Sequence, residues 1–111
     1  MSNIKKILDS VMEELELRNA IDPVVIDVQG ISSFCDFIII ASMDSERGVK
    51  SLSNYLNEKL KKKLKINTKT DGISSPSWIV IDTGDIMVHL FHKETRKYYD
   101  LESLWQSSKK G

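Results

Sequence analysis

The sequence predicts a single α/β domain, in which one mixed five-stranded sheet carries flanking helices. Its 111 residues are enough for one domain with one hydrophobic core. Short apolar or β-branched runs, typical of strands, alternate with longer segments of helical periodicity. The predicted order is helix, strand, strand, helix, three strands and a final helix, which fits a sheet with helices packed on it.

The first half of the chain begins with an amphipathic helix that we expect to end near residue 18. Its apolar residues recur at helical spacing and are Ile4, Ile7, Leu8, Val11, Met12 and Leu15. Two short strands are predicted at 24–28 and 37–41, joined through a turn at 30–33. The second strand is almost wholly apolar, which is typical of strands buried on both faces.

A second helix is expected after Asp44 or Ser45, because either residue can cap its first turn. Its apolar stripe consists of Val49, Leu52, Leu56 and Leu60. Its C-terminal end, where the helix dipole favours cations, carries Lys59, Lys61, Lys62, Lys63 and Lys65. Such a run is usually a solvated face, and the alternative is a patch that faces RNA.

The second half of the chain is rich in strands. We expect a short strand over 66–69, a loop over 71–76, and a hairpin formed by strands 78–81 and 86–91. A short helix beginning at Asp100 carries Leu101, Leu104 and Trp105. The predicted domain therefore covers residues 1–105, and residues 106–111 form a flexible tail.

The hairpin has two chemically different faces if Thr83 and Gly84 form a two-residue loop. One face is aliphatic and is predicted to be core. The other face places Asp82 opposite Asp85, two like charges that destabilise a hairpin unless a cation is near. This second face comprises Trp78, Val80, Asp82, Asp85, Met87 and His89.

Two interpretations of this second face remain open. In one, a helix covers Trp78 and a cation of the same chain neutralises the carboxylates. In the other, the face binds a basic protein partner, with Trp78 as the buried aromatic anchor that such interfaces favour. The solvent exposure of Trp78 distinguishes them.

Composition excludes several classes of protein. Sixteen basic residues balance sixteen acidic ones, whereas a generic nucleic-acid binder has a basic surplus. The single cysteine, Cys35, excludes an internal disulfide and a multi-cysteine zinc site. No apolar run approaches the length of a membrane span, and the N-terminus does not resemble a signal peptide, so we expect a soluble cytoplasmic protein.

The residues that catalysis would need are not arranged for it. Cys35 begins an apolar strand, a position typical of an inert buried thiol. His89 and His92 fall on opposite faces of a strand and cannot share a metal there. Gly30 followed by Asp36 is similar to the glycine-then-acid arrangement of nucleotidyltransferases, but the second carboxylate two positions later is absent. With no phosphate-binding glycine loop either, we expect no enzymatic activity, no metal and no cofactor.

Several ordered motifs run through residues 4–105, and together they resemble the ribosomal silencing factor family, RsfS or Iojap. The matching segments are Asp27-Val28-Gln29-Gly30-x-Ser32-Ser33-x-x-Asp36, Ser45-x-Arg47-x-Val49, Trp78-Ile79-Val80-x-Asp82-x-Gly84-Asp85-x-x-Val88-His89 and Arg96-x-x-Tyr99-x-Leu101-Glu102-x-Leu104-Trp105. The resemblance implies a nucleotidyltransferase-like fold that lacks the catalytic carboxylate pair.

The resemblance also implies a function and a binding site. Members bind the large ribosomal subunit through ribosomal protein L-fourteen, block its joining with the small subunit and repress translation in starvation or stationary phase, without a cofactor. Plant and mitochondrial relatives serve in organelle ribosome assembly or translation. The family's partner-binding tryptophan matches Trp78, whereas Asp82, Gly84 and Asp85 match as surface and turn residues. Ser77 departs from the family, which often has an acidic residue there.

Two other functions stay open at this point. One is a divergent nucleotide-binding protein, in which Asp36 occupies the position of the catalytic acids in the parent fold. The other is an RNA-binding ribosome-assembly factor that uses the lysines at 59–65, which are also a candidate for a secondary rRNA contact. A homodimer of the free protein, formed through a sheet edge or the Trp78 face, is compatible with the sequence.

Overall fold

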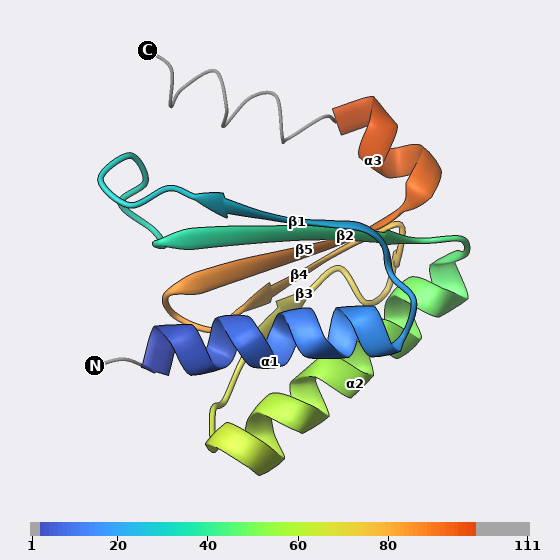
Figure 1. Cartoon of the computed structure of the whole chain (residues 1–111). Helices are drawn as coiled ribbons and strands as arrows, with labels where there is room; N and C mark the ends of the chain where they lie inside the picture. Colours follow the sequence, from blue (N-terminus) through green and yellow to red (C-terminus); the bar gives the residue numbers. More distant parts are fainter. Residues whose placement is uncertain (1–2, 100–111) are drawn as a thin grey trace.

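A computed structural model describes residues 3–99 of the chain and has the predicted α/β architecture (Figure 1). The elements are α1 (Asn3–Leu17), β1 (Ile21–Asp27), β2 (Phe37–Met43), α2 (Glu46–Leu64), β3 (Lys69–Asp71), β4 (Trp78–Asp82), β5 (Ile86–His92) and α3 (Lys93–Tyr99). Their order is the predicted one, although the last helix occupies Lys93–Tyr99, before the helix that the sequence predicts at Asp100. None of the helices in residues 3–99 is long and apolar enough to cross a membrane.

The five strands form one mixed sheet in the order β1-β2-β5-β4-β3. The central pair, β2 and β5, is parallel, and the other pairs are antiparallel. The long helices α1 and α2 lie together against one face of the sheet, whereas the short α3 lies on the other side of it (Figure 1). The sheet face turned away from α1 and α2 is therefore covered only in part, by the short helix α3, and is the face more open to a partner.

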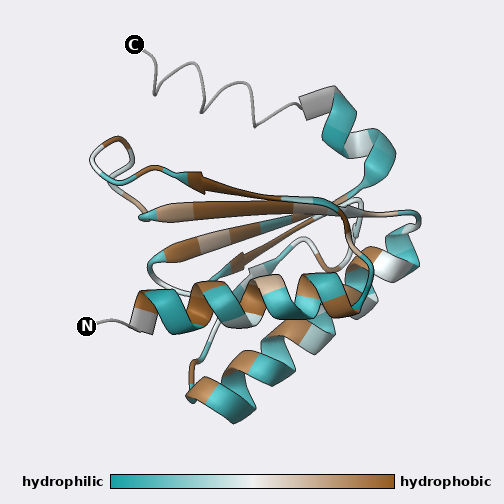
Figure 2. Cartoon of the chain, viewed as in Figure 1, coloured by the Kyte–Doolittle hydropathy of each residue, from teal (hydrophilic) through white to brown (hydrophobic). Residues whose placement is uncertain are grey.

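The main core lies between the sheet and the two long helices. The predicted apolar stripes of α1 and α2 supply Ile7, Val11, Leu15, Val49, Leu52, Leu56 and Leu60, each at most 3% exposed. Figure 2 shows hydrophobic residues along the central strands, and mixed colouring on both long helices, as expected for amphipathic elements. This packing holds the sheet against its helical layer and fixes which side of each strand faces outward.

The N-terminal end of α2 has the capping chemistry that the sequence predicts, and its C-terminal end has a cap that was not predicted. Ser45 rather than Asp44 is the N-cap, and its Oγ accepts a hydrogen bond from the backbone N–H of Gly48 at 3.0 Å. At the other end, Lys65 adopts a left-handed conformation with φ of 59°, and its backbone N–H donates to the carbonyls of Leu60 and Lys61.

Three boundaries differ from the prediction. β3 occupies Lys69–Asp71 rather than 66–69, because Ile66 instead packs against the main core next to the cap of α2. β1 starts at Ile21 and passes through Pro23, which an irregularity in the pairing between Ile21 and Val24 accommodates at this sheet edge. The unpredicted α3 follows β5 directly. The helix expected at Asp100 and the tail 106–111 lie outside the described residues.

Candidate partner-binding face

The structure brings five of the predicted site residues together on the sheet face that is turned away from α1 and α2. They alternate along two neighbouring strands and are Trp78, Val80, Asp82, Met87 and His89. All five are half-buried. Gly84 and Asp85, the other two predicted residues, are exposed in the turn that joins β4 to β5.

The turn itself is one residue further along the chain than predicted. Thr83 pairs with Ile86 through an N–H to carbonyl bond of 3.0 Å, so Gly84 and Asp85 form the loop. Asp82 consequently lies opposite Met87 rather than Asp85, and the predicted pair of opposed carboxylates is wrong. Because every facing pair changes by two residues, the strand residues keep their predicted faces, whereas Asp85 moves from the second face into the turn.

Asp82 has a structural partner in this turn. One oxygen of its carboxylate accepts a hydrogen bond from the backbone N–H of Gly84 at 2.8 Å. Gly84 has a φ of 106°, a conformation that side-chain-bearing residues rarely adopt. Asp82 and Gly84 therefore define the end of the hairpin and leave the carboxylate of Asp85 at the surface.

Trp78 is held in a defined orientation by its neighbours. Its indole N–H donates to Nδ1 of His89 at 3.1 Å, and its ring stacks on Phe91 with 5.0 Å between centroids. Phe91, at 1% exposure, is the buried base of this aromatic group. Sequence reasoning missed Phe91 because the predicted register left it unpaired, whereas the observed register places it directly opposite Trp78.

His89 is neutral in this environment. Burial lowers its pKa from the usual 6.5 to about 4, since the charged imidazolium would lose its hydration. A neutral ring can keep Nδ1 unprotonated as the acceptor that the Trp78 indole requires. The aromatic group is therefore ordered by an uncharged hydrogen bond and by stacking.

Gly72 positions the backbone of Trp78 from the β3–β4 loop. Its φ is 95°, and a Cβ on it would lie 2.3 Å from the carbonyl oxygen of Trp78. Only a residue without a side chain can pass this close, so Gly72 allows the loop to fold directly against the start of β4.

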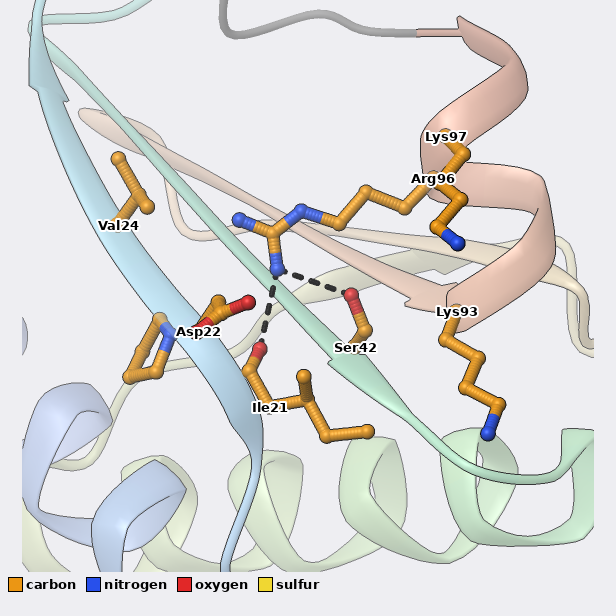
Figure 3. Close-up of a pocket in the computed structure, with 8 residues that line it drawn as sticks. Ile21, Asp22, Val24, Ser42, Lys93, Arg96 and Lys97 are labelled. Atoms are coloured by element: carbon orange, nitrogen blue, oxygen red, sulfur yellow. Dashed lines mark hydrogen bonds between the residues drawn. The ribbon is translucent and has the colours of Figure 1, made fainter.

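A cleft between α3 and strands β1 and β2 is lined by three basic side chains and by Asp22 (Figure 3). Arg96 reaches from α3 across the sheet and donates to the carbonyl of Ile21 at 3.0 Å and the hydroxyl of Ser42 at 2.9 Å. Ser42 is the register partner of Phe91, so the cleft and the aromatic group are neighbours. Lys93 and Lys97 also line the cleft. The two hydrogen bonds of Arg96 connect α3 to β1 and β2.

The predicted lysine cluster divides into two parts. Lys59 is only 13% exposed and forms ion pairs with Glu13 at 2.7 Å and Glu14 at 3.4 Å, so it joins α2 to α1. The remaining four lysines, Lys61, Lys62, Lys63 and Lys65, are exposed at the end of α2. The candidate rRNA patch therefore consists of four cations, not five.

Residues that catalysis or metal binding would use are separated in the structure. Cys35 is 8% exposed, and burial raises the pKa of its thiol, as expected for an inert cysteine. His92 contacts the carbonyl of Asp44 at 3.1 Å, on the side of β5 opposite His89. Within residues 3–99, no cluster of three histidine, cysteine or carboxylate side chains is placed to hold a metal.

Known proteins are similar to this chain in both sequence and fold. The family model described as "Ribosomal silencing factor during starvation" matches residues 1–111. A Bacillus subtilis protein named ribosomal silencing factor RsfS is 31% identical over 103 residues, which cover 93% of this chain and 87% of that protein. A Mus musculus protein named mitochondrial assembly of ribosomal large subunit protein 1 is 33% identical over 102 residues, which cover 88% of this chain and 44% of that protein.

A solved structure agrees with the sequence comparison. The crystal structure of a Chromobacterium violaceum protein matches with a TM-score of 0.89 and 34% identity, covering 96% of this chain and 88% of that chain. The family match spans the whole chain, and the structural likeness includes nearly all of it. The chain therefore belongs to the ribosomal silencing factor family.

Proposed function

We propose that this protein binds the large ribosomal subunit through ribosomal protein L-fourteen, and that it thereby blocks joining with the small subunit and represses translation. The observation that carries the proposal is the family match over the entire chain. Exclusion is steric and needs no cofactor. It takes place in the cytoplasm, where subunits of a bacterial ribosome meet.

The Trp78 face is the surface that we assign to L-fourteen. It combines a half-buried indole with the carboxylates of Asp82 and Asp85, which suits a basic protein partner better than bare RNA. Trp78 is already oriented by His89 and Phe91, so docking loses little side-chain freedom. Val80, Met87 and His89 would complete the contact surface around it.

A secondary contact with ribosomal RNA is assigned to the four exposed lysines at the end of α2. Clustered cations on an electrically neutral chain supply a local phosphate-binding patch without a general affinity for nucleic acid. The name of the mouse relative refers to assembly of the large ribosomal subunit. This name supports the large subunit as the partner, but it indicates a role in assembly rather than in silencing.

Subunit joining tests the proposal directly. Purified small and large subunits are mixed with the protein at a magnesium concentration that supports joining, and then separated on a sucrose gradient. Free subunits should accumulate, and the protein should travel with the large subunit. Normal joining, with the protein at the top of the gradient, would contradict the proposal and return nucleotide or RNA binding to first place.

Trp78→Ala tests the assigned face. The loss of a central aromatic anchor should weaken large-subunit binding by roughly 30- to 1,000-fold, equivalent to about 2–4 kcal/mol. Leu17→Ala is the matched control, because Leu17 is an exposed apolar residue on α1, across the sheet from this face. Circular dichroism must show that both variants are folded. Unchanged co-sedimentation of folded Trp78→Ala would exclude this face as the main contact.

A further inference from the structure

Phe34 is the most exposed large hydrophobic side chain in the described part of the chain. It lies in the β1–β2 loop and is 85% exposed, and Ile31 of the same loop is 42% exposed. An isolated exposed apolar residue is common on protein surfaces. Phe34 differs because the loop that carries it is ordered and adjoins the Trp78 face.

Hydrogen bonds hold the loop in one shape. The amides of Ile31 and Ser32 both donate to the carbonyl of Val28, and the amide of Val28 donates to the carbonyl of Asp36 at 2.9 Å. The amide of Phe34 donates to the hydroxyl of Ser32 at 3.0 Å. Phe34 is therefore presented to solvent by a fixed backbone, an arrangement that lowers the entropy cost of binding.

The residues after Phe34 connect this loop to the candidate site. Cys35 is buried in the same apolar cluster as Trp78 and Met87. The amides of Asp36 and Phe37 donate to the carbonyl of Asp85 at 2.8 and 3.3 Å. Figure 1 shows the β1–β2 loop and the β4–β5 turn at the same end of the sheet. The loop is thus continuous with the Trp78 face.

The charges around Phe34 indicate the kind of partner. The two segments that meet here, residues 27–37 and 82–87, contain no lysine or arginine and four aspartates, namely Asp27, Asp36, Asp82 and Asp85. Lys69 is the single lysine or arginine in the five strands, and it lies opposite Asp82 in the register of β3 and β4. A phenylalanine among carboxylates fits an apolar pocket bordered by basic side chains, whereas RNA phosphates would be repelled.

We propose that Phe34 is a second apolar anchor, which inserts into a pocket with basic borders on the same ribosomal protein that the Trp78 face binds. The inference rests on the proposed function and adds a contact at the outer end of the sheet. Because the side chain is already exposed, its removal should weaken the complex without unfolding the protein.

Large-subunit binding by the full chain tests this contact. Phe34→Ala should bind purified large subunits about 5- to 30-fold more weakly than wild type in a pelleting assay, and Phe34→Leu should retain most of the affinity. Leu17→Ala, which removes a side chain that is 66% exposed on α1, is the control and should change binding by less than about twofold. Thermal unfolding should match that of wild type for all three.

Phe34→Lys distinguishes a protein pocket from RNA. A cation placed against basic borders should bind more weakly than Phe34→Ala, whereas tighter binding with steeper salt dependence would identify RNA and overturn the proposal. Equal binding by wild type and Phe34→Ala would overturn the Phe34 contact alone. Loss of a wild-type dimer in Phe34→Ala, with large-subunit binding intact, would identify a second copy as the occupant. If wild type itself does not bind, the proposed function fails first.

Discussion

The two faces of the β4–β5 hairpin are built from alternate residues of the same strands but have opposite properties. On the face that α1 and α2 cover, Ile79, Ile81, Ile86, Val88 and Leu90 have no exposed surface. On the other face, Trp78, Val80, Met87 and His89 remain half-buried and include a hydrogen-bonded aromatic pair. Alternation thus lets one hairpin provide stability on one side and the proposed partner-binding surface on the other.

The largest expected effect concerns the covered face. Ile81→Ala should lower the free energy of unfolding by about 2–5 kcal/mol, because Ile81 has no exposed surface and its truncation leaves a cavity in the main core. Val80→Ala, its neighbour on the other face, should cost less than about 1.5 kcal/mol, because Val80 is only half-buried. Urea unfolding of both variants measures the difference. Equal destabilisation would show that the two faces are packed alike.

A smaller effect is expected at the start of β4. Gly72→Ala should destabilise the protein by about 2–4 kcal/mol, since its Cβ would collide with the Trp78 carbonyl in a left-handed backbone. Gly84→Ala is the matched control, because Gly84 also has a positive φ but no atom within 4 Å of the added Cβ. It should cost only about 1–2 kcal/mol, for the backbone conformation alone. Similar thermal shifts for the two variants would exclude the close approach as the cause.

The smallest expected effect is a pH dependence that arises from His89 on the Trp78 face. The folded pKa of His89, about 4, lies below its usual 6.5, so the unfolded chain takes up the proton first as the pH falls. The free energy of unfolding should therefore decrease as the pH falls from 6.5 towards 4. The value at about pH 5 should be about 2 kcal/mol lower than the value at about pH 8.

His89→Gln removes this titration and keeps a side-chain oxygen that can accept the Trp78 N–H. Chemical denaturation of wild type and His89→Gln at several pH values isolates the contribution of His89. If the variant loses as much stability as wild type over this range, His89 is not the group responsible.

The sequence predicted the faces of the hairpin better than its turn. The period of two along 78–82 and 86–91 determines which residues share a face, whatever the loop. Gly84 suits either of two adjacent turns, and the side chain of Thr83, bonded to Ile86, favours the later one. The alternation was therefore sufficient to place Trp78 and His89 on one face, but not to place Phe91 opposite Trp78.

Features that depend on distant contacts could not be predicted. Residues 93–97 of α3 have no apolar stripe, and Arg96 instead ties the helix to Ile21 and Ser42, far away in sequence. In the sequence, Lys59 is one of five similar lysines. Its ion pairs with Glu13 and Glu14 form only in the folded chain, where α1 lies beside α2. Phe34 lies in a loop without periodicity, so only the folded chain shows its exposure.

The parallel pairing of β2 with β5 has a consequence for how the protein folds as it is synthesised. Phe37 pairs with Ile86 across nearly half of the chain, and β5 also joins β4 to the sheet. Contacts so distant in sequence form late and slowly, and a nascent chain that ends before β5 has no central strand. Partly synthesised chains that end before β5 therefore lack the Trp78 face.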